Sequence, residues 1–168
     1  MKLGWCPEVD GLLESFEALR GLVVGASVPA GAGVEERLVS LTPKQVGLDG
    51  KVAASGDWDL FCGGLLYAAN LLGKAHEIFQ EAQSSEGSYW HGMLHRREGD
   101  FSNALYWIRR AGPIPALSGI ADFSPSAFGA DCSAAAARGA EPPHLLELQR
   151  REWTAMMVWS WRRLALLG

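Results

Sequence analysis

The chain has 168 residues, of which 48% are apolar and 20% are charged, and its formal net charge is −4 at pH 7. This length and balance predict a single globular domain over residues 1–168 with a sizeable hydrophobic core. The negative charge argues against general nucleic-acid binding, and no uncharged apolar stretch reaches the roughly 18 residues that predict a membrane span.

The first part of the chain predicts one helix followed by loops. A stripe of apolar residues predicts an N-terminal helix over residues 7–20, with proline at its first position and Gly21 at its end. Residues 25–57 are rich in glycine and other small residues, so we expect a loop-rich segment there, with one short helix at residues 35–41.

Four helices are expected next, in close succession, at roughly residues 58–69, 72–84, 88–98 and 101–111. Asp57 and Asp100 suit the N-cap positions of the first and the last of them. Asn70 and Gly99 stand where the chain must leave a helix through left-handed backbone, which both residues tolerate. The four helices should therefore form two antiparallel hairpins.

The last third of the chain predicts a connection and one long helix. Residues 112–143 are rich in proline, glycine and alanine, with a short helix near residues 124–138. The final helix, residues 144–167, is apolar over most of its circumference, which is typical of a buried helix or a subunit contact. We expect it to cap the exposed end of the helical stack. The predicted fold class is all-α.

Two stretches of the chain repeat each other at a distance of 29 residues. Four residues of the first stretch recur in the second with the same internal spacing: Gly63, Ala75, Phe79 and Ala82 correspond to Gly92, Ala104, Ile108 and Ala111. Internal repetition of this kind is the signature of stacked helical hairpins. The small residues would let paired helices approach closely, with the larger side chains between them.

This pattern, Gly-x11-Ala-x3-[Phe/Ile]-x2-Ala, resembles the tetratricopeptide-type repeat, and residues 72–82 and 98–108 are similar to its second helix. The likeness covers about 55 residues, and the period is shorter than the typical value of about 34. The resemblance implies a binding role.

Residues 88–112 also resemble a signature of uncharacterised bacterial and fungal proteins, of the form YWHxxxHRRExDxxNAxYWxRRxG. Residues 148–153 are similar to the C-terminal helix of that family. This second resemblance implies no known activity.

Polar residues replace apolar ones at inward positions of the second repeat. His91 and His95 occupy the places that Cys62 and Leu66 hold in the first repeat. Together with Glu98, the two histidines fall within about 60° of arc on one face of a helix. This replacement is the strongest indication of a functional site in the sequence.

Two interpretations of the histidines stay open. Two imidazoles and a carboxylate on one face could hold a zinc, iron or manganese ion, with His76 as a further ligand. Alternatively, each buried imidazole could simply bond a neighbour in a structural network, with Glu98 satisfying His95 and a tyrosine satisfying His91.

Arginine and tryptophan side chains extend the candidate site. Arginine pairs flank the turn at Asp100, where they could bind a phosphate or carboxylate or pair with acidic residues of the chain itself. The candidate ligand-binding residues are His91, His95, Arg96, Arg97, Glu98, Asp100, Asn103, Trp90, Trp107 and Arg109.

These residues predict a binding module for a small acidic ligand or a protein segment, with neither nucleic acid nor membrane as a partner. One alternative is a metal-dependent enzyme that uses His76, His91, His95 and Glu98. Another is a homodimer formed through residues 144–167.

Several catalytic motifs are missing from the sequence. It contains no G-x-S-x-G, no P-loop and no G-x-G-x-x-G after a strand. The three cysteines form no C-x-x-C pair, and the first residues lack the apolar run of a signal peptide. Both features predict a reduced, cytoplasmic setting.

Overall fold

The computed structural model describes residues 7–14, 19, 21, 33–48, 51–52 and 56–167. Within these residues the protein is all-α. Its helices are α1 (Pro7–Glu14), α2 (Val34–Val39), α3 (Gly56–Ala68), α4 (Leu72–Glu81), α5 (Ser85–Glu98), α6 (Phe101–Ala111), α7 (Pro125–Ala136) and α8 (Pro143–Leu167), with short 3₁₀ helices η1 (Pro43–Val46) and η3 (Pro115–Leu117). None of the described helices combines the length and the apolarity that crossing a membrane requires.

Consecutive helices from α3 to α6 pack against one another in antiparallel pairs, which confirms the predicted order of helices. The turns between the helices of each pair use the predicted residues. Asn70 has φ 61° and Gly99 has φ 82°, so both adopt left-handed backbone. Each hairpin therefore turns at the same position of the repeat.

The same close contact joins the two helices of each hairpin. A Cβ atom added to Gly63 of α3 would lie 2.5 Å from Cε1 of Phe79 in α4, and one added to Gly92 of α5 would lie 2.8 Å from Cγ1 of Ile108 in α6. Neither position has room for a side chain, since such distances are far below van der Waals contact. The predicted pairing of small and large residues is confirmed in both hairpins.

Several predicted helix ends were wrong, and a local hydrogen bond explains one of them. The Ser84 side chain accepts a hydrogen bond from the Gly87 backbone N–H at 2.9 Å, so α5 begins at Ser85 and not at residue 88. Asp57 is not an N-cap, because α3 already begins at Gly56. Its carboxylate instead pairs with the Arg163 guanidinium at 2.8 Å.

The ends of the first two predicted helices also differ from the structure. The helix predicted over residues 7–20 cannot run to its predicted end, because Leu19 has φ 58° and lies in a turn. The short helix predicted at residues 35–41 is found at Val34–Val39. Most of the loop predicted between residues 25 and 33 lies outside the described residues.

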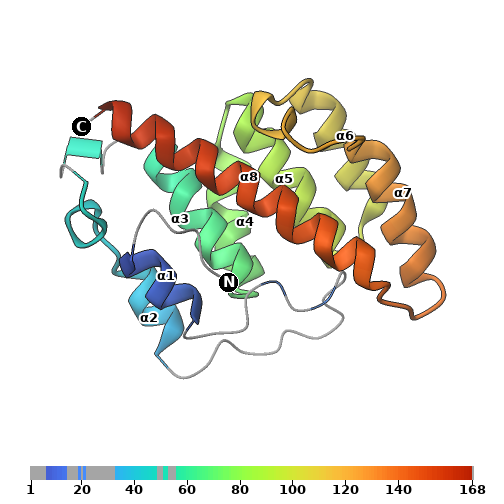
Figure 1. Ribbon diagram of the computed structural model, residues 1–168, viewed down its shortest axis with the longest axis horizontal. Helices are drawn as coiled ribbons and strands as arrows, with labels where there is room; N and C mark the ends of the chain where they lie inside the picture. The colour runs from blue at the N-terminus through green and yellow to red at the C-terminus, as the bar shows by residue number, and fades with distance from the viewer. Residues whose placement is uncertain are drawn as a thin grey trace.

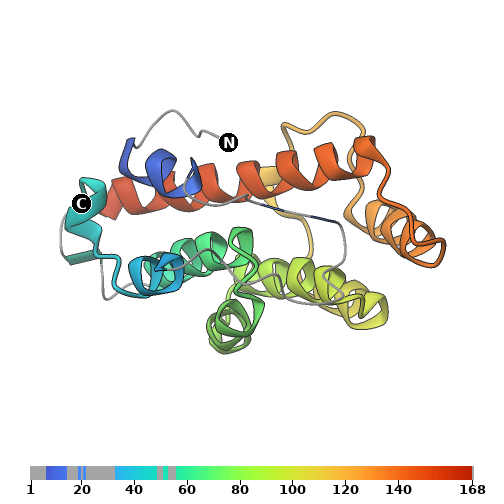
Figure 2. The ribbon, with the colours of Figure 1, turned by 90° about the horizontal axis from the view of Figure 1, so that it is seen from below.

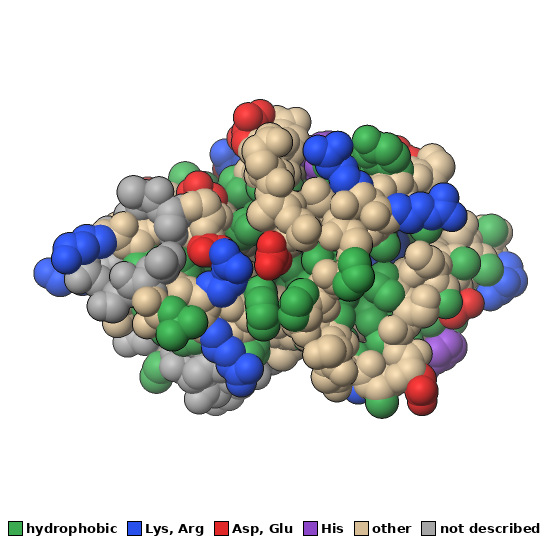
Figure 3. All heavy atoms as spheres, turned by 90° about the horizontal axis from the view of Figure 1, so that it is seen from above, with side chains coloured by type: hydrophobic (Ala, Val, Ile, Leu, Met, Phe, Trp, Pro, Cys, Tyr) green, Lys and Arg blue, Asp and Glu red, His purple; other side chains and the backbone are tan. Residues whose placement is uncertain are grey.

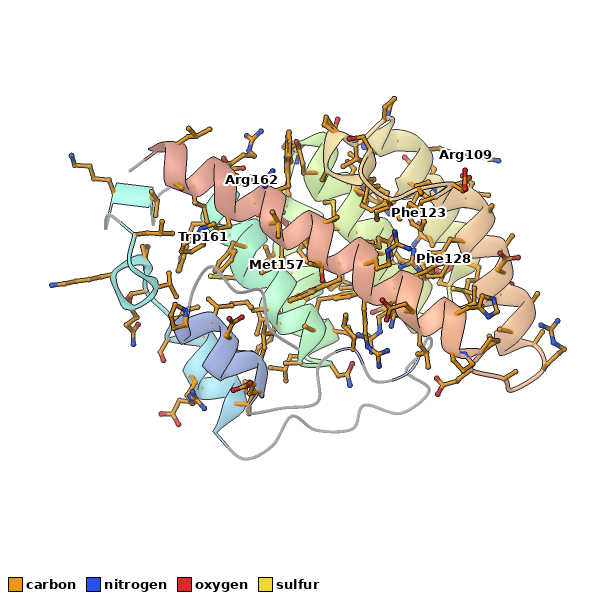
Figure 4. The ribbon with its side chains drawn as sticks, in the orientation of Figure 1. Arg109, Phe123, Phe128, Met157, Trp161 and Arg162 are labelled. Carbon is orange, nitrogen blue, oxygen red and sulfur yellow. The ribbon has the colours of Figure 1, made fainter. Side chains whose placement is uncertain are left out.

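The long helix α8 runs across the hairpins along the length of the molecule (Figure 1). It lies on one side of α3 and α5, and α4 lies on the opposite side (Figure 2). Figure 4 shows Met157 and Trp161 on the side of α8 that faces α3, where the Trp161 ring is 5.7 Å from that of Phe61. The helix therefore covers a side of the hairpins, and the expectation that it caps their end is corrected.

Charges of both signs are interspersed on the surface that Figure 3 shows, around hydrophobic side chains that gather in the middle of that face. A continuous positive surface, which nucleic-acid binding requires, is not seen on this face.

Candidate metal centre

Three histidines lie together where α4 of the first hairpin packs against α5 of the second. His91 and His95 are one turn apart on α5, and the α4–α5 connection brings His76 of α4 against them. One possible ligand atom from each residue lies within 4.8 Å of the others. His91 is 4% exposed and His95 is 7% exposed, whereas the side chain of His76 is 32% exposed. The cluster thus has a buried base and one side near solvent.

The imidazole rings are close enough to share one small partner. Nε2 of His76 lies 2.9 Å from Nε2 of His91. The rings of His91 and His95 are stacked with centroids 4.6 Å apart, and the ring of His76 stands edge-on to both. In a tetrahedral zinc site with Zn–N bonds of about 2.05 Å, ligand nitrogens are about 3.3 Å apart. The 2.9 Å between Nε2 of His76 and Nε2 of His91 is close to this value.

A carboxylate and an amide contact the outer atoms of these rings. The two oxygens of Glu98 lie 3.1 Å from Nδ1 of His95 and 3.7 Å from Nδ1 of His76. The contact with His95 has ion-pair distance without hydrogen-bond alignment. Nδ2 of Asn103 lies 3.1 Å from Nε2 of His95. Metal-binding histidines commonly have such carboxylate or amide neighbours.

The position of Asn103 follows from the start of α6. The Asp100 side chain accepts hydrogen bonds from the Asn103 backbone N–H at 3.2 Å and from the Ser102 hydroxyl at 3.0 Å. These bonds to the carboxylate lower the pKa of Asp100. Asp100 therefore acts as the predicted N-cap of α6. The cap fixes the first turn of α6, and this turn places Asn103 beside His95.

Burial keeps two of the imidazoles in the form that binds metals. It lowers the pKa of His91 to about 4, with further lowering by the neighbouring His95 and His76. Burial also lowers the pKa of His95, against the opposing effect of the Glu98 carboxylate. Both rings are therefore uncharged at neutral pH, with a lone pair available to a cation.

Trp107 forms one wall of the cluster. Its ring stacks on His91 with centroids 4.2 Å apart and an interplanar angle of 26°. The Arg110 guanidinium lies 5.3 Å from the centroid of Trp107, and the exposed Tyr106 meets Trp107 edge-on. Trp107 therefore lies against the cluster, and its part in binding stays a prediction.

Arg96 and Arg97 do not join the histidines, although both were candidate ligand-binding residues. Arg96 is fully buried and pairs with both oxygens of Glu152 on α8, which also accepts a hydrogen bond from the Tyr89 hydroxyl. Burial alone would lower the pKa of Arg96, but the Glu152 carboxylate raises it overall. The guanidinium also lies over the ring of Phe128, which Figure 4 places beside α8.

Arg97 is equally buried and is bonded inside the protein. Its guanidinium donates hydrogen bonds to the Tyr67 carbonyl at 3.2 Å and to the Asn70 side chain. Arg96 therefore follows the alternative of pairing with an acidic residue of the chain, whereas these bonds of Arg97 go to a carbonyl and an amide oxygen.

The other two candidates are also apart from the histidines. Trp90 is buried in the core, stacked on Phe79 with centroids 5.4 Å apart. Arg109 lies on the outer surface of α6 (Figure 4), beside a hollow of about 450 Å³ that is lined with Ser102, Leu105, Tyr106 and Arg110.

Comparisons of the chain with protein-family profiles, with curated proteins and with solved structures found no match in any of the three. The geometry of this cluster is therefore the basis on which a function is proposed.

Proposed function

We propose that this protein binds a divalent transition-metal ion, with His76, His91 and His95 as the ligands. The observation that carries the proposal is the convergence of three imidazoles, two of them buried and uncharged, within 4.8 Å. Imidazole nitrogen is a suitable ligand for zinc, copper, iron and nickel. Among these metals we expect zinc first, because zinc prefers tetrahedral sites with nitrogen ligands.

The cluster has fewer hydrogen-bond partners than a purely structural network needs. Buried polar atoms are normally paired, yet Nδ1 of His91 has no hydrogen-bond partner among the residues that the structure describes. The ring pair His76–His91 can share one proton, and Nδ2 of Asn103 faces Nε2 of His95. The oxygens of Glu98 lie near Nδ1 of His95 and of His76, without hydrogen-bond alignment to His95. A cation is the partner that can accept three lone pairs at once, which favours metal binding over the network interpretation.

The proposal includes the tetratricopeptide-like arrangement and its binding role. Two observations support it: the matching glycine contacts in the two hairpins, and the left-handed turns at Asn70 and Gly99. In this proposal the second hairpin carries metal ligands where the first carries Cys62 and Leu66. The homodimer through α8 stays a prediction, and the buried side chains of Trp153, Met156 and Met157 already pack within the chain.

A metal-dependent enzyme is the second candidate, which the partial exposure of the site favours. The side chains of His76 and Glu98 are each about one-third exposed, so a bound ion would be reachable from solvent. Buried structural zinc sites are normally closed by four protein ligands.

The first test measures metal binding directly on protein purified without a histidine tag. We expect about one zinc ion per chain after equilibration and dialysis, by elemental analysis and by titration calorimetry. His76→Ala should abolish stoichiometric binding, and because His76 is partly exposed this variant should still fold. His144→Ala is the matched control, since His144 is exposed on α8 and outside the cluster. Equal zinc binding by both variants, or none by the wild type, would reject the proposal.

A further inference from the structure

We infer that the metal keeps one coordination position for a small carboxylate-type anion. Glu98 is not a ligand but orients the imidazoles from outside the metal site. Asn103 donates a hydrogen bond to the bound anion. This inference rests on the proposed metal site and adds the chemical class of its ligand. It assigns different roles to two residues that lie equally close to the histidines.

The contacts of Glu98 show why it is better placed as an orienting group than as a ligand. Each of its oxygens faces the Nδ1 atom of a different histidine, at 3.1 Å for His95 and 3.7 Å for His76. With the ring proton of each on Nδ1, the lone pair of each lies on Nε2. In His76 this Nε2 is the atom that faces His91 at 2.9 Å. Carboxylates that receive the outer N–H of metal-binding histidines are a common arrangement.

Three protein ligands leave a fourth position on a tetrahedral ion. Sites with three protein ligands typically bind water or another exchangeable group there. His91 and His95 form the buried side of the cluster, so the open position would lie toward the partly exposed side near His76. A small molecule can therefore reach it from solvent.

Asn103 is placed to bind what occupies that position. Its Nδ2 lies 3.1 Å from Nε2 of His95. A metal bound at this Nε2 would take the place that the amide nitrogen now holds, so the Asn103 side chain would turn aside and its N–H would lose its acceptor. An oxygen atom bound to the metal would be the replacement acceptor for this half-buried donor.

The surrounding charges favour an anion. A divalent ion with three neutral imidazoles has a charge of +2, which Glu98 reduces to about +1 for the whole site. Arg110, over the Trp107 ring, adds a positive charge at the rim. Asp100 is the opposing negative group, but it is exposed and its carboxylate is occupied by the cap of α6. A carboxylate would thus fill the fourth coordination position and neutralise the remaining positive charge of the site.

The experiment uses cobalt(II), whose visible absorption reports coordination. We expect cobalt-loaded protein to change its spectrum on titration with acetate or azide, with saturation at one anion per cobalt. Asn103→Ala should weaken anion binding by about 10–150-fold, the equivalent of one hydrogen bond to a charged group, while cobalt binding persists. Ser102→Ala is the matched control, because Ser102 lies on the same turn and its hydroxyl contacts Asp100.

Glu98→Gln separates the two roles of the carboxylate. If Glu98 orients the rings, the variant should bind cobalt about 10–100-fold more weakly but show the wild-type spectrum and anion response. A wild-type spectrum that does not change on addition of anions would overturn the inference. An anion response that appears only in Glu98→Gln would also overturn it, and would show that Glu98 is the fourth ligand. Absence of cobalt binding would overturn the proposed metal site itself, so the two failures are distinguishable.

Discussion

Acidification should destabilise the metal-free protein through His91. The pKa of this buried ring is lowered to about 4, whereas an imidazole with its ordinary value titrates near 6.5. Between these values the unfolded state binds more protons than the folded state, so the free energy of unfolding falls as the pH falls. About one pH unit above this ordinary value and higher, the ring is neutral in both states and contributes almost no pH dependence.

The size of this effect follows from the difference between the two pKa values. At about 1.4 kcal/mol per pKa unit, full protonation would cost at most about 3.4 kcal/mol. At about pH 5 the same linkage gives about 2 kcal/mol. Solvent beside the partly exposed His76 screens part of the repulsion among the rings, so we expect about 1–2 kcal/mol.

The assay is urea unfolding of the wild type and of His91→Gln, with EDTA present, between about pH 7.5 and about pH 5. Glutamine does not titrate, so the difference between the two proteins isolates His91 from the carboxylates. The stability of the wild type relative to the variant should fall by about 1–2 kcal/mol over this range. A relative stability that is constant, or that rises in acid, would refute the reasoning, because the folded-state pKa of His91 would then not lie below its ordinary value.

Three further perturbations test the site and the packing. Zinc at about 100 times its dissociation constant should raise the free energy of unfolding by about 2.7 kcal/mol, or the Tm by about 5–11 °C, and His76→Ala should remove this shift in thermal scans. Glu152→Gln should cost about 3–5 kcal/mol in urea unfolding, because it leaves the Arg96 charge buried without its counter-ion; a loss below 1 kcal/mol would contradict this. Gly92→Ala should cost about 1–3 kcal/mol, since the added Cβ meets backbone as well as side chain. Gly73→Ala, with open space around it, should be neutral or stabilising by up to about 1 kcal/mol in the same assay.

Those features of the site that depend on one helix could be predicted from the sequence. His91 and His95 are four residues apart, and helical geometry alone places them on the same face. The repeat alignment added that this face points inward, which their burial confirms. His76 was recognisable as a candidate through its place in the neighbouring hairpin, but its distance from the other two rings depends on how α4 packs against α5.

The roles of the arginines could not be predicted in the same way. Arg96 pairs with a carboxylate 56 residues away in the sequence, on a helix that approaches α5 only in the folded chain. Several nearer acidic residues were equally good partners by spacing alone. Nothing local distinguishes an arginine that faces a ligand from one that faces Glu152.

Local forces therefore determined the helices, the left-handed turns at Asn70 and Gly99 and the glycine contacts within each hairpin, because these depend on residues that are close in sequence. Tertiary packing decided the rest. It laid α8 along the side of the hairpins, paired Arg96 with Glu152, and brought His76 to 2.9 Å from His91. These outcomes depend on which surfaces of distant segments fit together, and on the cost of burying charged groups without partners, which only the folded chain can settle.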